Sequence, residues 1–336
     1  MDSNPSITTY PDIAATAFGR KGKITASIII YSELYLVAVG YIIIEGDNLH
    51  KLFPNFAIKL GNLTVDGRNS FAIVAGAVIF PSILLTNLGV LSYISFGGVI
   101  SSLIIVAAVL CVGTTKGVGF HEKGNLVNFK GLPTALSLYT FSYGGHAMFP
   151  AIYNSMKEKS QFPKVLLLSF ITCTIIYASM AIVGYLMYGH NIQSQVTLNL
   201  PKEKISSKVA IYTILASPIA KYALTIMPIS TAIESCLPEN YHQKRPLRIL
   251  IKMLLLVSTV VLAMLVPSFE TVTSLTGALL IVSVSFLLPC VCYLKIFKIY
   301  KHFGYELAGI SGIILLAILV GVLGTYSAIA HTIKEA

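Results

Sequence analysis

Charged side chains are scarce in this sequence. Only 11% of its 336 residues are charged and 55% are apolar, whereas an ordinary soluble domain is roughly a quarter charged. The mean hydropathy of +0.78 leaves too few polar side chains to cover the outside of a water-soluble fold. These proportions exclude an ordinary cytosolic enzyme and predict that lipid surrounds most of the chain.

The common sequence motifs of enzymes are also missing. There is no Gly-x-x-x-x-Gly-Lys-Ser/Thr loop for ATP, no His-Glu-x-x-His zinc motif and no Gly-x-Ser-x-Gly nucleophile elbow. The five cysteines lie in or beside apolar segments and indicate neither a disulfide framework nor a zinc site. We therefore predict no catalytic residue, no metal and no cofactor.

Basic residues outnumber acidic ones, 24 to 14, for a formal net charge of +10. They occur in small clusters between apolar runs, which is typical of loops that anchor a membrane protein and not of a nucleic-acid surface. A small excess on alternate connections predicts a cytosolic N-terminus and a C-terminus on the opposite side. The sequon at Asn62 falls in a loop on that opposite side and makes Asn62 a glycosylation candidate.

Apolar runs long enough to cross a bilayer, about 20 residues each, define the expected architecture. Residues 1–23 lack the apolar stretch of a signal peptide, so we expect a cytosolic segment with a short surface helix at 12–18 begun by Pro11. Residues 24–332 are expected to form the transmembrane domain of an all-α polytopic membrane protein. About nine spans are predicted, at 24–44, 70–89, 91–113, 132–153, 164–188, 208–234, 247–266, 270–294 and 305–332.

Ionisable side chains inside these spans are the first candidates for function, because each costs several kcal/mol in hydrocarbon unless it faces a cavity or a partner. They are Glu33, His146 and Lys221. Glu33 and Lys221 lie about halfway along their spans, and each can either line a polar path or hold helices together as half of a buried pair. Further charged residues near span ends favour an interfacial or capping role, namely Glu45, Asp47, Glu234, Lys252 and Glu270.

The fourth span contains poor helix-forming residues in its middle, Gly144 and Gly145, followed by Pro150. This pattern favours an unwound joint between two half-helices, whose free amide and carbonyl groups can hold the carboxylate and ammonium of an amino acid. A kink that only improves packing is the alternative. Beside the glycines, His146 can carry a proton near neutral pH or serve as a packing residue.

Several stretches of the chain are similar to those of a known family. They are Tyr10 to Ile13, Ala17 to Arg20, Glu33 to Tyr35, Glu45 to Leu49, Phe141 to Tyr153, Ala216 to Leu224 and Ser274 to Gly277. In these stretches the sequence resembles the amino acid/auxin permease family, and in particular the vacuolar amino acid transporters of plants and fungi.

The resemblance implies a fold similar to the leucine transporter, in which two inverted five-helix repeats are followed by an extra helix. Members of the family have about eleven spans, and the motifs place the start of this chain just before the third. We therefore expect an N-terminally truncated bundle that lacks the first two helices. The fourth span here corresponds to the sixth of the family, one of its two broken helices.

The resemblance also implies roles for particular residues. The stretch Ser142, Tyr143, Gly144, Gly145 and His146 would bind the backbone of the substrate, with Tyr139 and Tyr143 at the border of the side-chain pocket. Glu33 and Lys221 would flank the cavity as a proton-linked pair. The implied function is proton-driven transport of neutral amino acids across a vacuolar or plasma membrane.

Other functions compete with this interpretation. A non-transporting amino acid sensor, or an inactive truncated paralogue, would have the same apolar spans. A membrane-embedded enzyme is disfavoured because no span contains paired catalytic carboxylates or a nucleophile and a base. A channel is a further alternative function, although a broken helix suits alternating access better. The expected partners are a small amino acid and the lipid bilayer, with no nucleic acid and with the oligomeric state left open.

Overall fold

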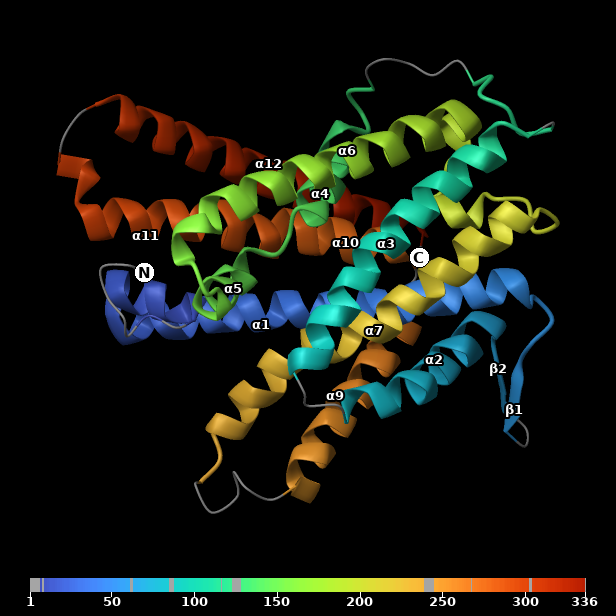
Figure 1. Ribbon diagram of the computed structural model, residues 1–336, viewed down its shortest axis with the longest axis horizontal. Helices are drawn as coiled ribbons and strands as arrows, with labels where there is room; N and C mark the ends of the chain where they lie inside the picture. Colours follow the sequence, from blue (N-terminus) through green and yellow to red (C-terminus); the bar gives the residue numbers. More distant parts are fainter. Residues whose placement is uncertain are drawn as a thin grey trace. The chain divides into compact units, whose positions relative to one another are not determined.

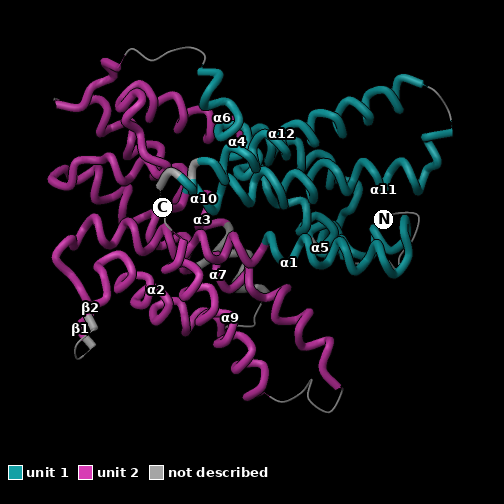
Figure 2. The backbone as a smooth tube through the Cα atoms, turned by 180° about the vertical axis from the view of Figure 1, so that it is seen from behind, with its two compact units in different colours: residues 1–33, 128–171, 270–336 teal, residues 34–127, 172–269 magenta. Residues whose placement is uncertain are grey.

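The computed structural model describes Ile7 and residues 9–60, 63–84, 88–115, 117–122, 128–238, 245–266, 268–301 and 304–335. The chain divides into two compact units, which are described separately below and coloured differently in Figure 2. Unit 1 consists of Met1–Glu33, Asn128–Ile171 and Glu270–Ala336, and unit 2 consists of Leu34–Val127 and Thr172–Phe269.

Helices dominate the described chain (Figure 1). They are α1 (Tyr10–Leu52), α2 (Gly67–Ile83), α3 (Leu88–Gly113), α4 (Leu132–Ser142), α5 (Phe149–Ser155), α6 (Phe162–Tyr188), α7 (Ile205–Ser235), α9 (Arg245–Leu265), α10 (Phe269–Leu275), α11 (Leu288–Phe297) and α12 (Tyr305–Glu335). Between α10 and α11 lie two π-helical stretches, η5 (Thr276–Ile281) and η6 (Ser283–Leu287). Short 3₁₀ turns are η1 (His146–Met148), η2 (Lys159–Gln161), η3 (Gly189–Asn191), η4 (Val196–Leu198) and η7 (Ile299–Lys301).

Within the described residues, strand is limited to one antiparallel pair, β1 (Ile58–Leu60) and β2 (Leu63–Val65), in which Ile58 pairs with Val65. Seven helical stretches among the described residues are long and apolar enough to cross a membrane. The prediction of an all-α polytopic membrane protein is therefore confirmed, whereas the inverted repeats stay a prediction. The other two predicted spans differ, because α2 has only 17 residues, about 26 Å of helix, and the span 132–153 is interrupted.

The first helix begins at Tyr10, well before the predicted start of the span at residue 24. The side chain of Asp12 accepts hydrogen bonds from the amide and hydroxyl of Thr9, and Pro11 occupies the first turn, where its missing N–H has no cost. The expected short helix at 12–18 is thus confirmed. Gly19, at φ +66° and ψ −155°, is not helical and separates this helix from the long one that runs on to Leu52, so α1 joins two helices across a kink.

Other boundaries lie closer to the prediction. The second span ends at Ile83, short of the predicted residue 89, and the third helix begins at Leu88, ahead of the predicted residue 91. The later spans begin and end within three residues of the predicted positions. Helix ends fray and apolar residues continue past them, so the periodic pattern alone does not define where a helix stops.

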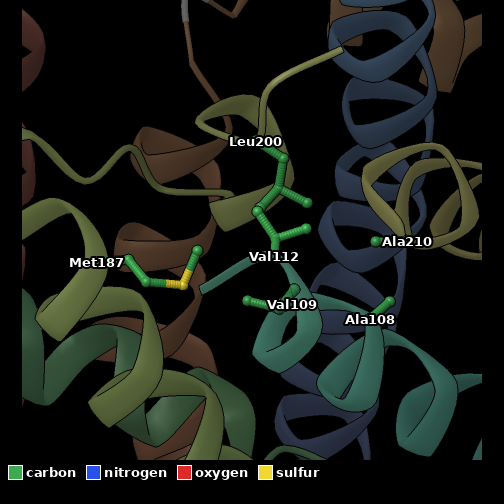
Figure 3. Close-up of a cluster of buried hydrophobic side chains, with 6 residues drawn as sticks. All are labelled: Ala108, Val109, Val112, Met187, Leu200 and Ala210. Atoms are coloured by element: carbon green, nitrogen blue, oxygen red, sulfur yellow. The ribbon is translucent and has the colours of Figure 1, made fainter. Parts of the chain in front are cut away.

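Unit 2 is built around α7, which packs against α2, α3 and α9. One of its cores joins Ala108, Val109 and Val112 of α3 to Ala210 of α7, with Met187 of α6 and Leu200 closing the cluster (Figure 3). Small side chains at this contact let the helix backbones approach, which is how helices pack when lipid provides no hydrophobic driving force between them.

Unit 1 is built around α4, which packs against η5 and α12. Gly277 of η5 faces the carbonyl of Ser137, and a side chain at position 277 would overlap that oxygen. Gly324 of α12 faces the side chain of the same serine. The close approach of the three helices therefore depends on glycine, as in other helix interfaces in membranes.

Replacement of Gly277 by alanine is expected to destabilise unit 1 by roughly 1–3 kcal/mol, the usual cost of forcing a methyl group into a packed site. Thermal unfolding of the detergent-solubilised protein measures the effect. Gly312→Ala is the control, because a methyl group at position 312 on α12 meets nothing within 4 Å. Equal unfolding temperatures for the two variants would contradict the close contact between α4 and η5.

Candidate functional site

The predicted fourth span is two helices in the structure. The first of them, α4, ends at Ser142, and α5 begins only at Phe149 (Figure 1). The turn η1 and residues 143–145 lie between them. The predicted interruption is therefore confirmed, and these residues together with η1 are called the joint below.

The backbone hydrogen bonds show how the α-helical pattern of α4 ends at the joint. The amides of Tyr143 and Gly144 donate to carbonyls three residues earlier, those of Thr140 and Phe141, instead of four. The next two amides, of Gly145 and His146, have no backbone acceptor in the described part of the chain. The joint thus presents donors that an intact helix would have used.

The two glycines of the joint serve different purposes. Gly145 has φ +153°, and a Cβ added there would meet nothing within 4 Å, so its backbone conformation, and not crowding, requires glycine. At Gly144, by contrast, a Cβ would lie 2.7 Å from Cδ1 of Ile281 in η5. One glycine allows the turn, and the other allows the joint to pack on the π-helical stretch.

Aromatic side chains border the joint on unit 1. The rings of Tyr139 and Tyr143 have centroids 4.9 Å apart, and Tyr143 stacks on Phe170 of α6 at 6.0 Å. The imidazole of His146 lies 4.6 Å from the ring of Phe149 and 6.1 Å from that of Phe170. The structure therefore brings the predicted residues Tyr139, Tyr143 and His146 to one aromatic cluster.

Two predicted polar side chains, those of His146 and Ser142, differ in whether they already have a hydrogen-bond partner. Nδ1 of His146 is buried and has no hydrogen-bond partner among the described residues, a costly arrangement that a ligand or water would relieve. The hydroxyl of Ser142 donates to the carbonyl of Leu138 at 2.9 Å, so it already has a partner on its own helix.

The two predicted proton-coupling residues belong to different units, so their pairing stays a prediction. Glu33 is 3% exposed, and its Oε2 has no hydrogen-bond partner among the described residues. The side chain of Lys221 on α7 reaches α3. Its Cε lies 3.4 Å from where a Cβ atom would be if Gly98 had one. The glycosylation candidate Asn62 lies outside the described residues.

A buried polar network in unit 2 was not predicted. Asp47 on α1 accepts from Arg68 on α2 at 2.7 Å and from the side-chain amide of Gln195 at 2.9 Å. Gln195 in turn accepts from Asn48 at 2.7 Å, and Asn48 accepts from the hydroxyl of Thr197 at 2.8 Å. The network holds the end of α1 to the segment around η4, and only Asp47 stands out in the sequence, as a residue near a span end.

Two lysines of unit 2 donate to backbone carbonyls at the ends of other helical segments in the same unit. Lys51 donates to the carbonyls of Thr197 at 2.6 Å and Leu198 at 2.9 Å, and Lys252 donates to that of Ile83 at 2.9 Å. Cations stabilise the carbonyl ends of helices. Of the interfacial or capping role predicted for Lys252, the structure confirms the capping of α2. Separately, the described ranges contain no group of three or more His, Cys, Asp or Glu side chains that could hold a metal ion.

Comparison with known proteins identifies the family. The family described as "Transmembrane amino acid transporter protein" matches residues 1–334. The chain is 49% identical over 333 residues to Amino acid transporter AVT1I of Arabidopsis thaliana, covering 99% of this chain and 82% of that protein.

Two further relatives come from the same plant. Amino acid transporter AVT1J is 45% identical over 330 residues, or 98% of this chain and 78% of the relative. Amino acid transporter AVT1E is 40% identical over 337 residues, or 100% of this chain and 64% of the relative. With its interrupted helix, its apolar spans and a family match over nearly all its length, the chain belongs to the family of transmembrane amino acid transporters.

Proposed function

We propose that this amino acid transporter is a secondary carrier that binds neutral amino acids at the joint between α4 and α5 and moves them with the energy of a proton gradient. We further propose that it acts in the vacuolar membrane, since the sequence resembles vacuolar members of its family. The observation that carries the proposal is that the amides of Gly145 and His146 have no backbone acceptor among the described residues.

The joint has the groups that the backbone of an amino acid needs. The amides of Gly145 and His146, which have no backbone acceptor in the described part of the chain, suit the carboxylate of a substrate. The carbonyls of the last turn of α4 suit its ammonium group, because a helix C-terminus carries partial negative charge. In transporters with broken helices, half-helix N-termini bind the carboxylate of the substrate, and unwound carbonyls and helix C-termini coordinate cations.

The side chains around the joint favour a neutral substrate. The predicted site residues are tyrosine, serine, glycine and histidine, and none of them carries a permanent charge at neutral pH. A substrate with a charged side chain would lose its water without gaining an opposite charge from these residues, which is costly in a bilayer. The rings of Tyr139 and Tyr143 instead offer apolar surface.

Glu33 is the proposed proton carrier, with Lys221 as its partner in the coupling. A carboxylate that is buried and unpaired is expensive in its charged form, and Oε2 of Glu33 has no hydrogen-bond partner among the described residues. Uptake of a proton removes that cost, so the protonation of Glu33 is suited to alternate during a transport cycle.

The purified chain, reconstituted in lipid vesicles, provides the direct test. We expect uptake of radiolabelled neutral amino acids that increases when a pH gradient is imposed. Binding of the labelled amino acid without flux would overturn the carrier function in favour of a sensor. Flux that does not respond to the gradient would overturn the proton coupling alone.

Substitution of Gly145 by alanine is expected to lower uptake about tenfold or more, because holding an alanine at the φ of Gly145 costs roughly 1–3 kcal/mol and the joint would rearrange to avoid it. The initial rate in vesicles measures the effect. Gly117→Ala is the matched control, since Gly117 also has positive φ, +93°, with open space around it, but lies far from the joint in sequence. A similar loss in both variants would contradict a specific role of the joint.

Substitution of Glu33 by glutamine, and of Lys221 by alanine, is expected to abolish the response of uptake to the pH gradient. Exchange of labelled for unlabelled substrate at equal pH should persist, because it needs the binding site and no net proton movement. If Lys221→Ala retains both the wild-type rate and the wild-type pH dependence, Lys221 has no part in the coupling.

A further inference from the structure

The carbonyl of Val284 lacks a donor within its own helix. In η6 the amide of Leu288 donates to Ser283, five residues earlier, so the next bond of this π-helical series would join the amide of residue 289 to the carbonyl of Val284. Residue 289 is a proline and has no N–H. Val284 is 0% exposed, so water does not replace the missing donor.

The hydroxyl of Tyr10 supplies the missing hydrogen bond. It donates to the carbonyl of Val284 at 2.6 Å, from a position 274 residues earlier in the chain. Tyr10 is buried, with 9% of its surface exposed, and lies in the first turn of α1. That turn is held by Asp12, which accepts from Thr9 and from Lys23 at 2.8 Å.

The same π-helical stretch contacts the joint. Ile281 lies one turn before Val284, and its Cδ1 is 2.7 Å from the Cβ position of Gly144. Gly277, one turn earlier again, packs against the backbone of Ser137 in α4. Movement of η5 and η6 along their axis would therefore displace either α4 or the joint.

We propose that Tyr10 is a positioning residue for transport. Its hydroxyl replaces the amide that Pro289 lacks and holds η6 in the register in which Ile281 packs on Gly144. The N-terminal turn thereby shapes the substrate site without touching the substrate. The effect on transport rests on the proposed function of the joint, whereas the effect on η6 does not.

Tyr10→Phe tests the proposal in the full chain, because it removes the hydroxyl and keeps the ring. In reconstituted vesicles we expect the KM for a labelled neutral amino acid to rise about fivefold, the factor that corresponds to one lost hydrogen bond, with little change in maximal rate. Tyr293→Phe is the matched control. Its hydroxyl donates to Glu306 at 2.7 Å in an exposed pair, and Tyr293 lines the same cavity of about 210 Å³ as Tyr10.

The double variant Tyr10→Phe/Pro289→Ala provides a rescue. Alanine restores an amide at position 289, which can donate to Val284 from within the helix, so the KM should return towards the wild-type value. A KM that is unchanged in Tyr10→Phe, or raised but not restored by Pro289→Ala, would overturn the proposal.

Hydrogen exchange separates this proposal from the proposed function. Without substrate, peptides covering residues 276–288 and 141–148 should exchange faster in Tyr10→Phe and return to the wild-type rate in the double variant. This pattern in a protein that shows no uptake would refute the carrier function and leave the role of Tyr10 at η6 intact. Unchanged exchange in both peptides would overturn the role of Tyr10.

Discussion

Backbone amides and carbonyls in hydrocarbon have no water to bind, so each of them needs a partner within the protein. An unbroken α-helix meets this requirement by itself, and every departure from it creates donors or acceptors that another group must satisfy. Two such departures in the described part of unit 1 concern the candidate site. The joint between α4 and α5 leaves amides available, and the π-helical stretch before Pro289 leaves the carbonyl of Val284 to the hydroxyl of Tyr10.

The two departures are in contact, which connects the packing of the π-helical stretch to the geometry of the joint. Gly144 allows the joint to lie against Ile281, and Gly277 allows α4 to lie against η5. Glycine at these positions removes the side chains that would keep the segments apart. The released amides of the joint are thereby held against a helix whose own register depends on the N-terminal turn.

In unit 2, several charged residues are held by polar partners. Asp47 and Lys51 lie near the end of α1, and Lys252 lies two turns inside α9. Each has a defined partner, in an ion pair or a backbone carbonyl. Such partners offset the cost of burial and join elements far apart in the chain. Lys221 lies instead in the middle of α7, which makes it a candidate for function.

The outline of the site follows from local chemistry and was predictable. A Gly-Gly pair inside an apolar run disfavours a helix wherever that run is placed, so the interruption at Gly144 and Gly145 did not require knowledge of the fold. The start of α1 was harder to predict. Gly19 adopts a non-helical conformation that separates two helices, and composition alone does not fix the residue at which the second helix begins.

By itself, the sequence determined that the chain is helical, that it lies in a membrane and that its fourth span is broken, because these depend on composition and on short-range backbone preferences. Only the tertiary structure decided which groups meet. Tyr10 and Val284, or Asn48 and Gln195, are separated by 274 and 147 positions, and no periodicity relates residues so far apart. Such bonds arise from how helices pack, and packing depends on the shapes of all the side chains at once.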